Sequence, residues 1–162
     1  MAFVSIAGTQ RSGKSTYLNR ALLGQKTGFG VESTTNSCTK GIWIWTGVIP
    51  RYSSAEGETV SIIIADTEGL GSLDADPNYV KKLGSLALSI SSHFMYNSVG
   101  TIGNDAINNL WLTTQNAKEL KSNDKTYETF SVPFTWLLRD TMRLEGEKGV
   151  KLTENEYLEF VL

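Results

Sequence analysis

The segment from Gly8 to Ser15 carries the strongest chemical signal in the sequence. It reads Gly-Thr-Gln-Arg-Ser-Gly-Lys-Ser and fits G-x-x-x-x-G-K-[ST], the pattern of a phosphate-binding loop. In such a loop, backbone N–H groups and the N-terminus of the following helix converge on one anion. We expect Lys14 to reach the β- and γ-phosphates and the Ser15 hydroxyl to bind Mg²⁺. The loop therefore predicts a site for a nucleoside triphosphate.

A second motif, D-x-x-G, is formed by Asp66-Thr67-Glu68-Gly69. At the end of a strand, Asp66 is expected to hold Mg²⁺ through water, and the Gly69 N–H to meet the γ-phosphate. Leu70 stands where small Ras-type GTPases have a glutamine that orients the attacking water. Another group must then place that water, and Glu68 and Ser37 are the two candidates.

These motifs need strands and helices to hold them, and the apolar pattern alternates between the two. Strands are predicted over residues 3–7, 41–49, 59–65, 94–99 and 132–138, and helices over 15–23, 79–91 and 105–120. This alternation predicts an α/β fold with a doubly wound, mostly parallel sheet. The ligand is expected beyond the carboxyl ends of the strands.

Composition excludes several classes of protein. With 162 residues, 40% hydrophobic content and a net charge of −2, the chain is expected to be a single domain with its own core and no nucleic-acid partner. The one cysteine, Cys38, is typical of a reducing, cytoplasmic location. No apolar run approaches the length of a membrane span, so membrane association is not encoded in this segment. The one histidine, His93, excludes multi-histidine metal sites.

The end of the sequence carries a helix signal of its own. Thr153-Glu154-Asn155-Glu156 forms a capping box, and apolar residues follow it up to Leu162. Because this apolar helix face has only just begun where the sequence stops, we expect residues 1–162 to be part of a longer domain.

Four segments together resemble the GTPase domain of the guanylate-binding proteins, which belong to the dynamin-related large GTPases. They are residues 8–22, 37–45, 66–71 and 96–102, and they occur in the same order as in that family. The resemblance implies a P-loop G domain over residues 1–162, of which the last strand and helix would lie beyond Leu162.

The resemblance also implies roles for single residues. Arg11 would be an internal arginine finger that swings onto the phosphates when two GTPase domains meet face to face. Thr39 would be the switch I threonine that binds Mg²⁺ and the γ-phosphate. Ser37 and Glu68 would position the attacking water. Cys38 stands where the family has a histidine, so no role is carried over to it.

Guanine recognition is expected from Leu138-Arg139-Asp140, which resembles the R-D element of the family. The sequence has no N-K-x-D motif after the last predicted strand. An Asp140 carboxylate can accept hydrogen bonds from guanine N1–H and the N2 amine, whereas adenine offers neither donor. Arg139 would cover the base.

These inferences predict Mg²⁺-dependent binding of GTP or GDP and hydrolysis of GTP, coupled to homodimerisation of G domains, with either GDP or GMP as the final product. The alternative is a guanine-nucleotide-binding module that switches assembly without hydrolysis, and a P-loop ATPase or kinase is a third possibility. The residues expected to bind the nucleotide are Gly8, Arg11, Ser12, Gly13, Lys14, Ser15, Thr16, Thr39, Gly69, Arg139 and Asp140. The expected catalytic residues are Arg11, Lys14, Ser37, Thr39 and Glu68, and the expected metal ligands are Ser15, Thr39 and Asp66.

Overall fold

The computed structural model describes residues 1–31, 39–47, 52–53, 59–69, 76–121, 131–140, 144–146 and 149–161. Its centre is a sheet of five strands in the order β2-β5-β1-β6-β7. The bounds of these strands are β1 Ala2–Gly8, β2 Ile42–Ile44, β5 Ile62–Thr67, β6 His93–Val99 and β7 Phe134–Arg139. Strands β1, β5, β6 and β7 are parallel, and β2 runs antiparallel to β5. The predicted mostly parallel α/β sheet is therefore confirmed.

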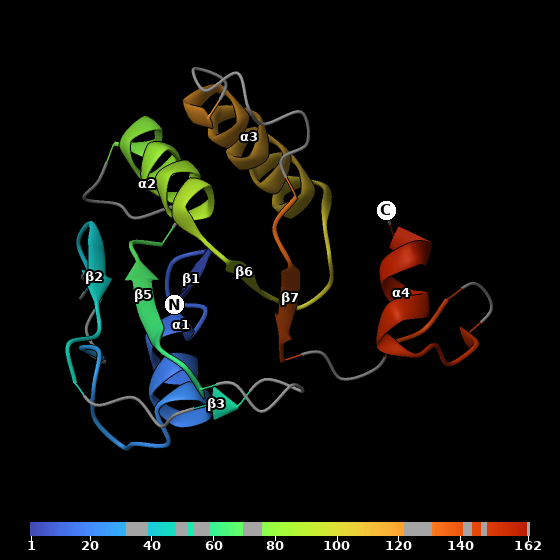
Figure 1. The fold of residues 1–162 in the computed structure, drawn as a ribbon. Coiled ribbons are helices and arrows are strands. Elements are labelled where there is room, and N and C mark those ends of the chain that lie inside the picture. The colour runs from blue at the N-terminus through green and yellow to red at the C-terminus, as the bar shows by residue number, and fades with distance from the viewer. Residues whose placement is uncertain are drawn as a thin grey trace.

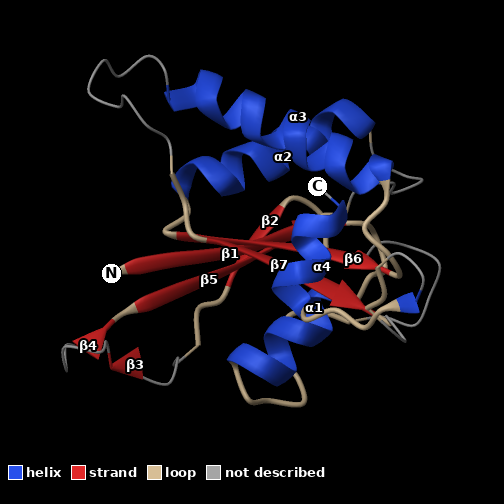
Figure 2. Cartoon of the chain, turned by 90° about the vertical axis from the view of Figure 1, so that its right-hand side faces the viewer, coloured by secondary structure: helices blue, strands red, loops and turns tan. Residues whose placement is uncertain are grey.

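Helices cover both faces of this sheet (Figure 2). Helices α2 (Pro77–Ile90) and α3 (Asn104–Lys121) pack together on one face. Helix α1 (Lys14–Tyr17) and a π-helical turn, η1 (Leu18–Leu22), follow β1 on the other face. Helix α4 (Glu154–Val161) lies beyond β7 (Figure 1), and its capping box is formed, because Thr153 N donates to Glu156 Oε2 at 2.8 Å.

The buried core divides into two clusters because alternate strand residues point to opposite faces. Ile6 of β1 and Met95 of β6 pack with Leu18, which comes from the α1/η1 side. The neighbouring strand residues Ala7 and Tyr96 belong to the second cluster, on the side of α2 and α3. The phosphate-loop motif thus joins a strand and a helix that are both anchored in the core.

Two predicted strands differ from the observed ones by more than two residues at one end. The strand expected over 41–49 is observed as β2, Ile42–Ile44, followed by one more ladder bond from Trp45 N to Ile64 O at 2.8 Å. After this bond the backbone at Gly47 lies against the Trp45 ring, whose Cζ2 is 2.5 Å from the place of a Cβ on Gly47. Residues 48–49 lie outside the described residues. The strand expected over 59–65 is interrupted at Ser61, so that β4 (Thr59–Val60) pairs with β3 (Tyr52–Ser53), and only β5 joins the main sheet.

Candidate functional site

The phosphate-loop residues lie where β1 ends and α1 begins, beside the carboxyl ends of β5 and β6. Gly8 closes β1 with φ +137, and a Cβ there would lie 2.0 Å from the Asn97 carbonyl oxygen, so only glycine allows this approach. Gly13, the residue before α1, also has positive φ. Arg11 is exposed at the tip of the loop, with a left-handed φ of 59.

Lys14 is buried under the loop, with 6% of its surface exposed. Its Nζ donates a hydrogen bond to the Thr9 carbonyl oxygen at 3.0 Å. Burial lowers the pKa of Lys14 to about 8, while the negative charges of Asp66 and Glu68 act in the opposite direction. The lysine is therefore held at the loop by a backbone carbonyl and two acidic neighbours.

Three oxygen-bearing side chains from separate segments meet beside Lys14. Ser15 Oγ donates to Asp66 Oδ2 at 2.5 Å, and Thr39 Oγ1 donates to the same oxygen at 3.0 Å. Asp66 is fully buried, and among the described residues its other oxygen, Oδ1, has no hydrogen-bond partner. Burial raises the pKa of Asp66, an effect opposed by the Ser15 hydrogen bond and the Lys14 charge. The predicted metal ligands are thus brought together.

The D-x-x-G segment closes the site from the side of β5. Glu68 is buried, and its Oε2 accepts a hydrogen bond from Gly41 N at 3.0 Å, while Glu68 N donates to Gly41 O at 2.9 Å. A Cβ on Gly69 would lie 2.4 Å from Gln10 Cα and 2.7 Å from Lys14 Nζ. Gly69 therefore packs directly against the phosphate loop. We call Gly8–Thr16, Thr39 and Asp66–Gly69 the phosphate end of the site.

Arg139 and Asp140 follow β7 and form what we call the base end. The Arg139 guanidinium reaches back to the phosphate loop, with Nη1 3.2 Å from the place of a Cβ on Gly13. Gly100 N donates to Arg139 O at 2.8 Å, which ties the ends of β6 and β7 together. Asp140 is exposed and has a left-handed φ of 58. The structure brings the predicted R-D element to the same edge of the sheet as the phosphate end.

Not every predicted residue has a described position, and one contact was not foreseen. Ser37, Cys38 and Leu70 lie outside the described residues. The buried side chain of Asn97, in β6, donates to Ser12 O at 2.8 Å and to Ser12 Oγ at 2.6 Å. Its signal in the sequence is an amide near the carboxyl end of a mostly apolar strand pattern, at the sheet edge where a ligand is expected.

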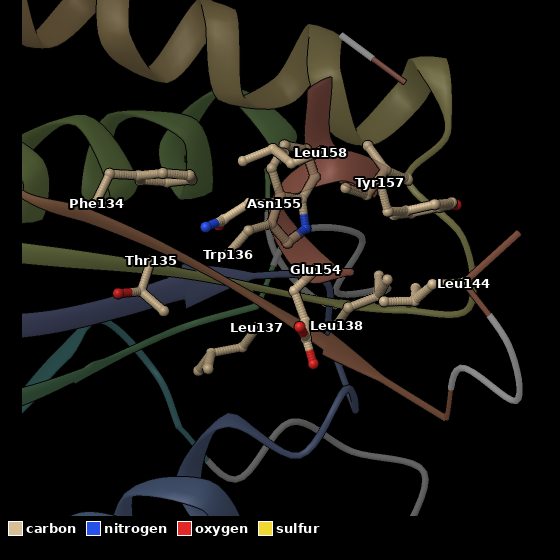
Figure 3. Close-up of a pocket in the computed structure, with 11 residues that line it drawn as sticks. Phe134, Thr135, Trp136, Leu137, Leu138, Leu144, Glu154, Asn155, Tyr157 and Leu158 are labelled. Carbon is tan, nitrogen blue, oxygen red and sulfur yellow. The ribbon is translucent and has the colours of Figure 1, made fainter. Parts of the chain in front are cut away.

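A separate pocket of about 640 Å³ lies between β7 and α4 (Figure 3). Apolar side chains dominate its lining, among them Trp136 and Leu138 from β7 and Tyr157 and Leu158 from α4. None of the phosphate-end residues lines it. The pocket is therefore distinct from the site described above.

In the described part of the chain, no three His, Cys, Asp or Glu side chains come together as a metal-binding group. The metal ligands predicted here, one carboxylate and two hydroxyls, are a different kind of set. None of the described helices combines the length and the apolar character that crossing a membrane requires.

Comparison with known proteins shows the family of the chain. Residues 1–162 match the family model described as the N-terminal domain of guanylate-binding protein. Guanylate-binding protein 2 of Homo sapiens is 37% identical over 98% of this chain, and guanylate-binding protein 1 of Mus musculus is 38% identical over 96% of it. The chain spans 28% and 27% of the length of these two relatives. On this match, and with a P-loop sheet of the expected topology, the chain belongs to the guanylate-binding protein family.

Proposed function

We propose that this chain binds a guanine nucleotide together with Mg²⁺ and hydrolyses GTP. The observation that carries the proposal is the convergence of Lys14, Asp66 and Gly69 on the loop between β1 and α1. These residues come from two distant segments, and each has the chemistry that a triphosphate requires. The names of the relatives, which describe them as binding guanylate, support a guanine nucleotide as the ligand.

Phosphate binding follows from the charges and donors at the phosphate end. Lys14 donates to the Thr9 carbonyl oxygen in the structure, and a phosphate oxygen is a stronger acceptor for the same ammonium group. The loop adds backbone N–H groups at the start of α1, where the helix dipole favours an anion. The Gly69 N–H, which lies against the loop, is placed to meet the terminal phosphate.

The residues beside Lys14 fit a magnesium ion. Mg²⁺ prefers hard oxygen ligands, and the hydroxyls of Ser15 and Thr39 already share one carboxylate oxygen of Asp66. The second oxygen, Asp66 Oδ1, is buried without a hydrogen-bond partner among the described residues. A bound cation, or a water molecule bound to it, would supply the missing interaction. When bound, Mg²⁺ neutralises part of the phosphate charge. Ser15 and Thr39 would hold it directly, and Asp66 through water.

The base end supports selection of guanine. Asp140 offers an exposed carboxylate next to Arg139, whose guanidinium touches the phosphate loop at Gly13. A carboxylate can accept from guanine N1–H and N2, whereas adenine would leave it without a donor. Selection of GTP over ATP therefore rests on Asp140, and Arg139 connects the base to the phosphates.

Hydrolysis needs a positioned water and stabilisation of charge on the γ-phosphate. The water oxygen bonds to the γ-phosphorus, the bond to the bridging oxygen breaks, and the products are GDP and inorganic phosphate. We assign the positioning of the water to Glu68 and Ser37. Arg11, exposed at the loop tip, is the arginine finger, and a finger of this kind accelerates the reaction by about 10³–10⁵. Its exposure suits a role in which a second GTPase domain pushes it onto the phosphates.

The alternative is a module that binds guanine nucleotide and switches self-assembly without hydrolysis. The observation that favours it is Leu70, which follows Gly69 where Ras-type GTPases have the water-orienting glutamine. Turnover separates the two functions. The arginine-finger mechanism predicts that Arg11→Ala lowers kcat by about 10³ while leaving affinity nearly unchanged. Arg20→Ala, which removes an exposed arginine of η1, is the matched control.

The first test is a titration of the chain, with Mg²⁺, against non-hydrolysable analogues of GTP and ATP. A clear preference for the GTP analogue supports guanine binding, and equal binding would restrict the proposal to the phosphate end. Absence of binding to either would overturn the proposal. If GTP is bound but not turned over, and Arg11→Ala changes nothing, the non-hydrolysing alternative holds.

A further inference from the structure

Asn97 lies in β6, in direct contact with the phosphate loop. It is fully buried and pairs in register with Gly8, the last residue of β1. Its carbonyl oxygen accepts a hydrogen bond from Thr9 N at 3.3 Å. The main chain of Asn97 therefore fixes the first residues of the loop.

The side chain of Asn97 fixes the other end of the same loop. Its Nδ2 donates to Ser12 O at 2.8 Å and to Ser12 Oγ at 2.6 Å. Ser12 Oγ in turn donates to Thr9 O at 2.7 Å, the oxygen that also accepts from Lys14 Nζ at 3.0 Å. Asn97, Ser12, Thr9 and Lys14 thus form a closed hydrogen-bond network beneath the loop.

The chemistry of this network requires an amide that donates. Ser12 O is a carbonyl oxygen and can only accept, so an oxygen in place of Nδ2 would face another acceptor. Asn97 Oδ1 is buried and has no hydrogen-bond partner within the described part of the chain. An amide whose acceptor is unused carries a desolvation penalty. Its two donated bonds to Ser12 are what offset that penalty.

We infer that Asn97 is a positioning residue of the nucleotide site, which acts through Ser12 and Thr9 to hold the loop in the shape that receives phosphate. The inference rests on the proposed function. Arg11 lies in the arc between Thr9 and Ser12 in a left-handed conformation, so the network supports a strained segment that would otherwise relax. Lys14 shares the Thr9 carbonyl with Ser12, so its resting place depends on the same network.

The sharpest test replaces the amide by a carboxyl of the same shape. In Asn97→Asp the ionised carboxylate cannot donate to Ser12 and is repelled by bound phosphate. The protonated carboxyl can donate one of the two bonds. Burial raises the pKa of such a carboxyl, so mild acid protonates it. The quantity to measure is the dissociation constant of a non-hydrolysable GTP analogue for the variant, divided by that for the unmodified chain at the same pH. We expect this ratio to be about ten at about pH 7.5 and below about three at about pH 5.5.

Two further variants separate positioning from a general loss of structure. Asn97→Ala should weaken binding by a similar factor that does not depend on pH. Ser98→Ala is the matched control, because Ser98 is the buried neighbour in β6 whose Oγ accepts from Trp136 Nε1 at 2.9 Å, away from the loop. The dissociation constant of the GTP analogue for Ser98→Ala should stay within about threefold of that for the unmodified chain at either pH.

Each outcome has a distinct meaning. Losses for Asn97→Asp at about pH 7.5 and for Asn97→Ala that are no larger than the loss for Ser98→Ala would overturn the positioning role while leaving nucleotide binding intact. Failure of the unmodified chain to bind the analogue would overturn both proposals. Binding without GTP turnover, with the pH-dependent ratio as expected, would remove hydrolysis from the proposed function and support the role of Asn97.

Discussion

The phosphate end and the base end of the proposed site are built in different ways. At the phosphate end, Lys14, Asp66 and Glu68 are all buried, and hydrogen bonds join Ser15 of α1 to Asp66 of β5 and Gly41, just before β2, to Glu68. At the base end, Asp140 is exposed and follows β7, the last strand in the order of the sheet. The phosphate end is therefore formed in advance of ligand binding, whereas the base end offers one carboxylate on an exposed turn.

This difference follows from where each end lies in the sheet. The phosphate loop follows β1, the central strand, which has β5 on one side and β6 on the other. Side chains from both neighbours can then reach the loop, as Asp66 and Asn97 do. In the described part of the sheet, β7, which precedes Asp140, has one neighbouring strand, β6. The link of Asp140 to the rest of the site is Arg139, whose guanidinium lies against Gly13.

The largest effect is expected from removing the charge at the phosphate end. Lys14→Met replaces the buried ammonium by an apolar chain of similar length. We expect the affinity for GTP and ATP analogues to fall together by at least about 30-fold, since losing one partner of a buried charge pair costs about 2–5 kcal/mol. Calorimetric titration measures both. Lys26→Met, at an exposed lysine, is the control, and retention of binding by Lys14→Met would contradict a phosphate end formed around this residue.

A change at the base end should instead separate the two nucleotides. Asp140→Asn replaces one acceptor oxygen by an NH2 donor. This donor would face the N2 amine of guanine, which is also a donor. The GTP analogue should bind about 10²-fold more weakly, while the ATP analogue is unaffected. Xanthosine triphosphate, which carries a carbonyl in place of that amine, should gain affinity. Asp105→Asn, in the exposed first turn of α3, is the control, and an unchanged preference for GTP would remove Asp140 from base recognition.

The sequence predicted the phosphate end better than the site as a whole. The loop and Asp66-Thr67-Glu68-Gly69 are local motifs whose residues are neighbours in the chain, and the structure places them together. Thr39 was expected only from the family resemblance, because a single threonine has no spacing that marks it as a ligand. Asn97 was missed for a physical reason: its partner Ser12 is 85 positions away, and only the register of β1 with β6 brings them together.

The fold shows the same division between local and distant causes. Periodicity predicted α2, α3 and the parallel strands, because each follows its own apolar pattern. The short β2 is followed by a local contact that no strand pattern marks, the packing of Trp45 against Gly47. The break at Ser61 depends on pairing between separate segments, because β4 pairs with β3 and only β5 joins the main sheet. Ser37 and Leu70 lie outside the described part, so the role of Ser37 in positioning the water stays a prediction.

A smaller effect is expected where the two motifs of the phosphate end touch. Gly69→Ala places a methyl group where Gln10 Cα and Lys14 Nζ lie, so the D-x-x-G segment must move away from the loop. Loss of one hydrogen bond to a charged phosphate costs about 1.5–3 kcal/mol, so we expect the affinity for a GTP analogue to fall about ten- to a hundredfold. Affinity for GDP, which lacks the γ-phosphate, should fall less.

A glycine in α2 provides the control for this variant. A Cβ on Gly84 would meet its nearest atom, Thr113 Cγ2, at an ordinary 3.7 Å. Gly84→Ala should therefore leave nucleotide affinity unchanged and stabilise the chain by up to about 1 kcal/mol, because alanine is the better helix former. Equal losses for GTP and GDP in Gly69→Ala would mean that Gly69 does not meet the γ-phosphate.

The smallest effect is a pH dependence that belongs to the phosphate end alone. Burial lowers the pKa of Lys14 from 10.5 to about 8 in the nucleotide-free chain. Between these values the unfolded chain binds more protons than the folded one, so the contribution of Lys14 to the free energy of unfolding rises with pH over that window. Phosphate binds the protonated amine, so affinity should change in the opposite direction. It should fall about tenfold from about pH 7 to about pH 9, where the phosphates themselves stay fully ionised.

Titrations of the GTP and ATP analogues across this range test the separation of the two ends. Both dissociation constants should rise together, and their ratio should stay constant, because the ratio reports Asp140 and the common rise reports Lys14. A ratio that changes with pH would mean that the two ends are coupled, with the Arg139 contact at Gly13 as the route. An affinity that does not change with pH would mean that Lys14 stays protonated throughout. The negative charges of Asp66 and Glu68 would then raise its pKa by more than burial lowers it.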